Sequence, residues 1–269
     1  MELKKKGYLI AIDLDDTIVT GFDNNDNLSL ELLKEIAKEN YVVIATGRPL
    51  RSSYYYYKML NLSTPIINYN GALIHNPSDK NFPKTYISVP KEWILKIIND
   101  NDFIVNIFCE IEDEIFLYKD QDYMNPYLHL DGGNLHVGDF KDTLPSDPNG
   151  AIVFSKLDSG EKLAKYIEDE FQGKLKIRFW NCEEYSLSEI YNPLTTKGNG
   201  LKQIIEYYNI DKDKTIAIGD GHNDIELFDE VKIKVAMANS HKDLLKYANV
   251  VTKSVYDHGV YHFLKDFFF

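Results

Sequence analysis

The chain has 269 residues, of which 44% are hydrophobic and 27% are charged, an ordinary globular composition. Its formal charge of −12 argues against nucleic acid or an anionic membrane as a partner, because both require a basic surface. The sequence has no apolar run long enough to span a membrane, no visible targeting segment and only two cysteines, so we expect a cytoplasmic protein without a disulfide framework.

Three segments of the chain combine a short apolar run with polar residues and glycine. They are YLIAIDLDDT at residues 8–17, YVVIATGR at 41–48 and TIAIGDGHND at 215–224. Consecutive apolar positions are typical of strands that are buried on both faces of a parallel sheet. A helical pattern at 28–40, with Ser29 as its expected N-cap, separates the first two strands, and another at 200–210 precedes the third. The sequence therefore predicts an α/β core with a parallel sheet.

The middle of the chain follows a different pattern. The spacing predicts the order helix, strand, strand, which occurs two times. A stretch rich in Gly, Pro and Asp near 131–150 separates the two occurrences. Such a segment is typical of a separate α+β module. We therefore expect an α/β core made of residues 1–81 and 191–269, interrupted by an inserted α+β domain at 82–190.

Polar side chains follow the predicted core strands. In open α/β sheets ligands bind beyond the carboxyl ends of the strands, and this rule brings Asp13, Asp15, Thr46 and Asp220 to one edge. Two carboxylates about 4 Å apart repel by about 1 kcal/mol in water and about 4 kcal/mol at an effective dielectric constant of 20. The cluster therefore predicts a cation, and Mg²⁺ suits a site with few carboxylates, several waters and a substrate phosphate.

Each of these polar residues then has an expected chemical task. Asp13 can attack phosphorus and form an aspartyl phosphate. Asp15, two residues further along an extended backbone, can protonate the leaving oxygen and then deprotonate water. Thr46 can donate a hydrogen bond to a phosphoryl oxygen. Lys197 begins a helix, so its ammonium and the helix N-terminus would both face an anion.

A calcium-binding EF-hand is the structural alternative for the segment DLDDT. A loop counted from Asp13 would need glycine at the position of Ile18 and glutamate at the position of Asn24. The sequence has neither, so we discard this interpretation.

The motifs resemble those of the haloacid dehalogenase-like (HAD) phosphatases, specifically the Cof-type group with a large α/β cap of type IIB. The four main segments are DLDDT at 13–17, TGR at 46–48, TKG at 196–198 and GDGHND at 219–224. Secondary signatures are NGA at 70–72, VAMANS at 235–240 and DHGV at 257–260. The resemblance implies a HAD-like Rossmannoid core, and the motifs cover nearly the whole chain outside the inserted domain at 82–190. That domain would be the cap, and it resembles the family in its topology without a sequence motif.

The resemblance also implies roles for individual residues. Asp13 would be the nucleophile and Asp15 the general acid and base. Mg²⁺ would be held by Asp13, the main-chain carbonyl of Asp15 and Asp220, with Asp224 as a support through water. The phosphate would be held by the Leu14 backbone, Thr46, Gly47, Arg48, Lys197 and Asn223. For Arg48, pinning the loop is an equal alternative, and Asp16 stands where this group commonly has glycine.

The expected function is Mg²⁺-dependent hydrolysis of small phosphate monoesters, such as sugar phosphates, through an aspartyl phosphate. A phosphomutase of the same superfamily remains open, because the same pair of aspartates can pass the phosphoryl group to a sugar hydroxyl. A receiver-like phospho-acceptor module is a third possibility. We expect a monomer or weak homo-oligomer whose partner is a small phosphorylated metabolite.

Overall fold

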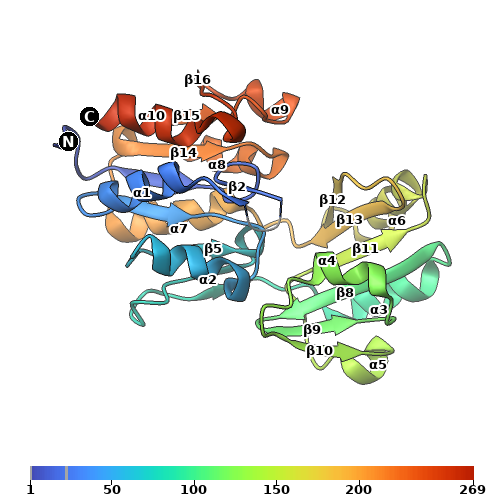
Figure 1. Cartoon of the computed structure of the whole chain (residues 1–269). Helices are drawn as coiled ribbons and strands as arrows, with labels where there is room; N and C mark the ends of the chain where they lie inside the picture. The colour runs from blue at the N-terminus through green and yellow to red at the C-terminus, as the bar shows by residue number, and fades with distance from the viewer. Residues whose placement is uncertain (1, 22–23) are drawn as a thin grey trace. The chain divides into compact units, whose positions relative to one another are not determined.

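The computed structural model describes residues 2–21 and 24–269, and its contacts divide the chain into two compact units (Figure 1). Unit 1 comprises residues 1–48, 53–85 and 196–269, and unit 2 comprises residues 49–52 and 86–195. None of the helices in the described ranges is long and apolar enough to cross a membrane.

Unit 1 contains a five-stranded parallel sheet in the order β16-β15-β14-β1-β4. The strands are β1 (Leu9–Ile12), β4 (Tyr41–Ile44), β14 (Thr215–Gly219), β15 (Ile233–Ala236) and β16 (Val250–Val251). All residues of β1 and β14 are buried, as the consecutive apolar positions of these segments predict. The α/β fold class expected from the sequence is confirmed.

Helices pack against this sheet. Leu201 and Ile204 of α7 pack with Leu227 of α8 against the face that carries Leu9 and Ala11. The other helices of unit 1 include α1 and α10, which contact each other. The bounds are α1 (Asn27–Ile36), α2 (Leu50–Met59, shared with unit 2), α7 (Lys197–Tyr208), α8 (Ile225–Asp229), α9 (Lys242–Leu245) and α10 (Gly259–Phe268).

Short elements complete unit 1. A hairpin made of β2 (Val19–Thr20) and β3 (Asn24–Asn25) follows β1, and β5 (Ile66–Asn68) pairs antiparallel with β6 (Leu73–His75) in a three-stranded sheet that ends at β7 (Thr85–Tyr86). Single helical turns are η1 (Tyr69–Gly71), η3 (Lys212–Lys214), η4 (His222–Asp224) and η5 (Val255–Asp257).

The first helix begins earlier than its hydrophobic pattern predicts. Asp26, not Ser29, is the N-cap of α1, and its side chain accepts a hydrogen bond from the backbone N–H of Ser29 at 3.2 Å. The expectation for Ser29 was therefore wrong. An N-cap side chain satisfies the N–H groups of the first turn, and aspartate does this as well as serine.

Unit 2 is an α+β module with a six-stranded sheet in the order β10-β9-β8-β11-β13-β12. One face packs against α3 and α6, and the other contacts η2 and α4. The strands are β8 (Ile104–Ile111), β9 (Glu114–Leu117), β10 (Asn134–Val137), β11 (Ala151–Ser155), β12 (Lys176–Trp180) and β13 (Ser186–Tyr191). The helices are α3 (Lys91–Asp100), η2 (Asp122–Met124), α4 (Asn125–Leu128), α5 (Phe140–Thr143) and α6 (Gly160–Phe171).

Candidate active site

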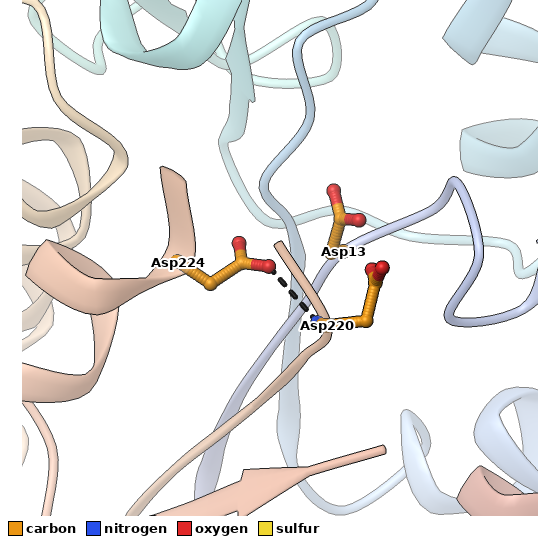
Figure 2. A group of neighbouring side chains, drawn as sticks. All are labelled: Asp13, Asp220 and Asp224. Carbon is orange, nitrogen blue, oxygen red and sulfur yellow. Dashed lines mark hydrogen bonds between the residues drawn. The ribbon is translucent and has the colours of Figure 1, made fainter. Parts of the chain in front are cut away.

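Three aspartates converge at the carboxyl ends of two neighbouring core strands (Figure 2). Asp13 directly follows β1, Asp220 directly follows β14, and Asp224 ends the turn η4. One carboxylate oxygen from each residue lies within 4.8 Å of the others. The parallel pairing of β1 with β14 produces this arrangement, since the Asp13 N–H donates to the Ile218 carbonyl at 3.0 Å. These donors are the oxygen ligands that a hard divalent cation prefers.

Lys197 lies among these carboxylates and is completely buried. Its ammonium donates to Asp13 Oδ1 at 2.6 Å and to Asp224 Oδ1 at 2.7 Å. Lys197 is the first residue of α7, and the hydroxyl of the N-cap Thr196 accepts a hydrogen bond from the Asn199 N–H at 3.0 Å. The N-cap residue Thr196 fixes where helix α7 starts, and so fixes the point from which the Lys197 side chain projects.

The site has an excess of negative charge in the absence of a cation. Burial raises the pKa of Asp13 to about 7, with repulsion by Asp224 and Asp15 adding to the effect and the attraction of Lys197 opposing it. Burial and the nearby Asp13 and Asp224 carboxylates raise the pKa of Asp220 to about 9. Burial lowers the pKa of Lys197, but Asp13 and Asp224 outweigh it and the net change is upward. One ammonium therefore does not balance three carboxylates.

Asp224 organises the loop as well as pairing with Lys197. Its Oδ2 accepts hydrogen bonds from the backbone N–H groups of Asp220 at 3.1 Å and Gly221 at 3.0 Å. A Cβ atom at Gly219 would lie 2.4 Å from the same oxygen, so this close approach requires glycine. Both oxygens of Asp224 accept hydrogen bonds from the protein, which fits a supporting position better than a direct metal ligand.

The Asp15 carboxylate binds Arg48. The Arg48 Nε lies 3.1 and 3.0 Å from the two carboxylate oxygens, and Nη2 lies 2.5 Å from Oδ1. The Arg48 side chain is 6% exposed and that of Asp15 is 47% exposed, so the guanidinium holds a carboxylate that still reaches solvent. Of the two roles expected for Arg48, this geometry favours anchoring the loop through Asp15.

The remaining predicted phosphate ligands lie in two short loops. Thr46 is buried, and its hydroxyl accepts a hydrogen bond from the Arg48 N–H at 3.1 Å, while Gly47 is exposed. Asn223 is 9% exposed, and its amide donates to Asn70 Oδ1 at 2.9 Å. The Leu14 side chain is buried, so only its backbone is left for a ligand. Their binding of phosphate stays a prediction.

Sequence reasoning gave no role to Thr17 or Asn70. The Thr17 hydroxyl donates to Asp220 Oδ1 at 3.0 Å and so orients a predicted metal ligand. Asn70, in the NGA signature, adopts φ 53° and places its side chain against Asn223 and Gly47. Both residues belong to segments that the sequence singles out, but their contacts cross between segments and depend on the fold.

Asp16 shows why glycine is common at its position. Its backbone has φ 54°, in the left-handed region that glycine adopts freely and that aspartate tolerates better than most residues. Its carbonyl accepts a hydrogen bond from the Asn239 amide at 2.8 Å, which connects the first motif to the VAMANS segment.

A family model of haloacid dehalogenase-like hydrolases matches residues 10–264, nearly the whole chain. The chain belongs to the haloacid dehalogenase-like hydrolases. The match confirms the family that the motifs resemble. Together with curated relatives that are named as phosphatases, it identifies the protein as a HAD-superfamily phosphatase.

Curated relatives match over almost their full length. A 5-amino-6-(5-phospho-D-ribitylamino)uracil phosphatase, YitU of Bacillus subtilis (strain 168), is 29% identical across 99% of both chains. Phosphatase YwpJ of the same organism is 26% identical across 96% of this chain and 98% of its own.

Solved structures share the fold of this HAD-superfamily member. A haloacid dehalogenase-like hydrolase from Bacteroides thetaiotaomicron is 22% identical, with a TM-score of 0.82 over 98% of this chain and 100% of its own. A HAD subclass IIB sugar phosphatase is 19% identical, with a TM-score of 0.79 over 97% and 98% of the two chains. At these identities the likeness supports the fold alone.

Proposed function

We propose that this HAD-superfamily phosphatase hydrolyses small phosphate monoesters in a Mg²⁺-dependent reaction that passes through an aspartyl phosphate on Asp13. The observation that carries the proposal is the contact of Lys197 with Asp13 inside the cluster of three aspartates. The lysine keeps the Asp13 carboxylate oriented in a buried place, and its charge attracts the phosphoryl group of a substrate.

The residues fit a magnesium ion. Three carboxylates and one ammonium leave two negative charges when all are ionised, which a divalent cation would neutralise. Asp13, Asp220 and the main-chain carbonyl of Asp15 would hold the ion, with Asp224 as a support. When bound, Mg²⁺ would reduce the repulsion between the phosphate and the carboxylates.

In the proposed first step, a carboxylate oxygen of Asp13 attacks phosphorus and the bond from phosphorus to the leaving oxygen breaks. Asp15 gives its proton to that oxygen, so that an alcohol leaves. Water then attacks the aspartyl phosphate, Asp15 takes back a proton, and inorganic phosphate and the Asp13 carboxylate are released. Arg48, which makes three N–H···O contacts with Asp15 in the structure, would hold the Asp15 side chain in place for both transfers.

We propose phosphorylated small metabolites as substrates, with sugar phosphates and sugar-alcohol phosphates foremost. The support is the relative named for a phosphoribitylamino-uracil, which matches the chain from end to end. We also propose a cytoplasmic monomer or weak homo-oligomer that binds no nucleic acid, since the net charge is −12 and neither cysteine forms a disulfide.

A phosphate-release screen tests the proposal. Purified protein is incubated with sugar phosphates and with 5-amino-6-(5-phospho-D-ribitylamino)uracil, in EDTA and in Mg²⁺. We expect release only with the metal. Full turnover in EDTA would contradict the magnesium site, and no consumption of any ester would contradict the function. Conversion of hexose 1-phosphate to 6-phosphate without release of phosphate would favour the mutase.

A further inference from the structure

An aromatic ring lies close to the guanidinium that holds Asp15. The central carbon of Arg48, Cζ, is 5.7 Å from the ring centroid of Tyr56 in helix α2. This separation is within the range of a cation–π contact. Arg48 is 6% exposed and Tyr56 is 3% exposed, so the contact is shielded from water. Cation–π contacts contribute most when they are shielded in this way.

The other end of Tyr56 contacts the hairpin that follows the first motif. Its hydroxyl donates to Asn25 Oδ1 in β3 at 3.0 Å. The hairpin in turn adjoins the loop that carries Asp15, because the Asp16 N–H donates to the Val19 carbonyl at 2.7 Å. Tyr56 therefore connects α2 both to Arg48, which binds Asp15, and to the hairpin that follows Asp15 in the chain.

We propose that Tyr56 is a positioning residue, whose ring keeps the Arg48 guanidinium on the Asp15 carboxylate so that Asp15 is aimed at the leaving oxygen. The inference rests on the proposed function, in which Asp15 is the general acid. An arginine has a long flexible side chain, and a carboxylate that is 47% exposed can rotate toward water. A buried ring against the guanidinium restricts both movements.

The neighbouring tyrosine provides a matched control. Tyr57 is on the same helix and is also 3% exposed. Its hydroxyl contacts the Thr64 carbonyl at 2.9 Å, Asn76 at 3.3 Å and Ser78 at 3.0 Å. Its replacement removes a buried ring of the same size from the same helix without removing the ring next to Arg48.

The test compares Tyr56→Leu with Tyr57→Leu on two kinds of ester. p-Nitrophenolate leaves without needing a proton, whereas an alkoxide from an alkyl phosphate ester needs one from Asp15. We expect Tyr56→Leu to lower kcat/KM for the alkyl ester about tenfold more than for p-nitrophenyl phosphate. We expect Tyr57→Leu to lower the melting temperature and to leave the ratio of the two kcat/KM values within about twofold of wild type.

An equal loss on both esters in Tyr56→Leu would overturn the proposal, because a purely structural role lowers the amount of active enzyme and not the ratio. If Tyr56→Leu does not fold, Tyr56→Met keeps most of the volume without a π face, and the same ratio decides. Tyr56→Phe retains the ring, so we expect a wild-type ratio, and a tenfold change there would overturn the role of the ring. If the wild-type protein hydrolyses no ester, the proposed function itself is rejected. If the wild type is active and Tyr56→Leu leaves the ratio of the two kcat/KM values unchanged, only the role of Tyr56 is rejected.

Discussion

The ammonium of Lys197 lies 2.6 Å from the carboxylate of Asp13, although the two residues are 184 positions apart in the chain. Both side chains are almost fully buried, and Lys197 also contacts Asp224. The pair therefore does two things: it offsets part of the negative charge of the cluster, and it fixes the carboxylate that we propose as the nucleophile. Each of the following predictions probes a consequence of this arrangement.

Asp13→Asn should lower the turnover of p-nitrophenyl phosphate by at least about a thousandfold, because an amide is a far weaker nucleophile than a carboxylate. The measurement is steady-state kinetics in Mg²⁺, with melting temperature as a check on folding. Asp16→Asn is the control, since asparagine tolerates the φ of 54° at this position, and we expect nearly full activity. Turnover near wild type in Asp13→Asn would reject the nucleophile.

Lys197→Ala should destabilise the fold by about 3–5 kcal/mol, because it leaves the Asp13 and Asp224 carboxylates buried without their cation. Urea unfolding at neutral pH measures the change. Lys38→Ala is the control: Lys38 also pairs with a carboxylate, Glu35, at 2.7 Å, but both side chains are more than half exposed. We expect that loss to be within about 1 kcal/mol. Equal effects would mean that burial does not strengthen the Lys197 pair.

The stability of the metal-free protein should fall as the pH rises. The pKa of Asp13 is raised from 3.8 to about 7 and that of Asp220 to about 9 in the folded chain, so folding favours their protonated forms. This contribution is complete below about pH 4 and is lost as the pH passes 7 and then 9. Melting temperatures in EDTA between pH 5 and pH 9 measure the slope.

Two comparisons isolate the cluster from the general effect of the acidic net charge. Asp220→Asn should give a flatter pH dependence in EDTA than wild type, because it removes one of the repelling carboxylates. Mg²⁺ should raise the wild-type melting temperature more at pH 8.5 than at pH 5, since the ion binds the ionised forms. Identical slopes for wild type and Asp220→Asn would show that these groups do not control the pH dependence.

Gly71→Ala should be strongly destabilising, by about 2 kcal/mol or more. Gly71 has φ 105°, and an added Cβ would lie 2.2 Å from the backbone oxygen of Thr196, directly before Lys197. Gly7→Ala is the control, because Gly7 also has a positive φ, 72°, but only the end of a lysine side chain lies within 4 Å. We expect thermal unfolding to show the larger loss for Gly71→Ala, and a similar loss at both positions would reject the steric explanation.

The sequence was informative where one physical signal dominated. Consecutive apolar positions at 8–12 and 215–219 are typical of buried parallel strands, and the α/β core follows from them. It was less informative where local signals compete. Asp26 and Ser29 are both good N-caps. The strand Asn134–Val137 alternates polar and apolar residues over only four positions, all of them exposed, which is too short a pattern to stand out within the glycine-rich stretch.

The tertiary structure alone decided the contacts between motifs. The sequence by itself determined that carboxylates, a threonine and a lysine would stand at strand ends and a helix start, because short-range hydrophobic patterns fix those elements. It did not determine that Arg48 binds Asp15, that Thr17 reaches Asp220 or that Asn70 meets Asn223. Such contacts depend on distances of a few ångströms between segments far apart in the chain, and only the packing of the whole core sets those distances.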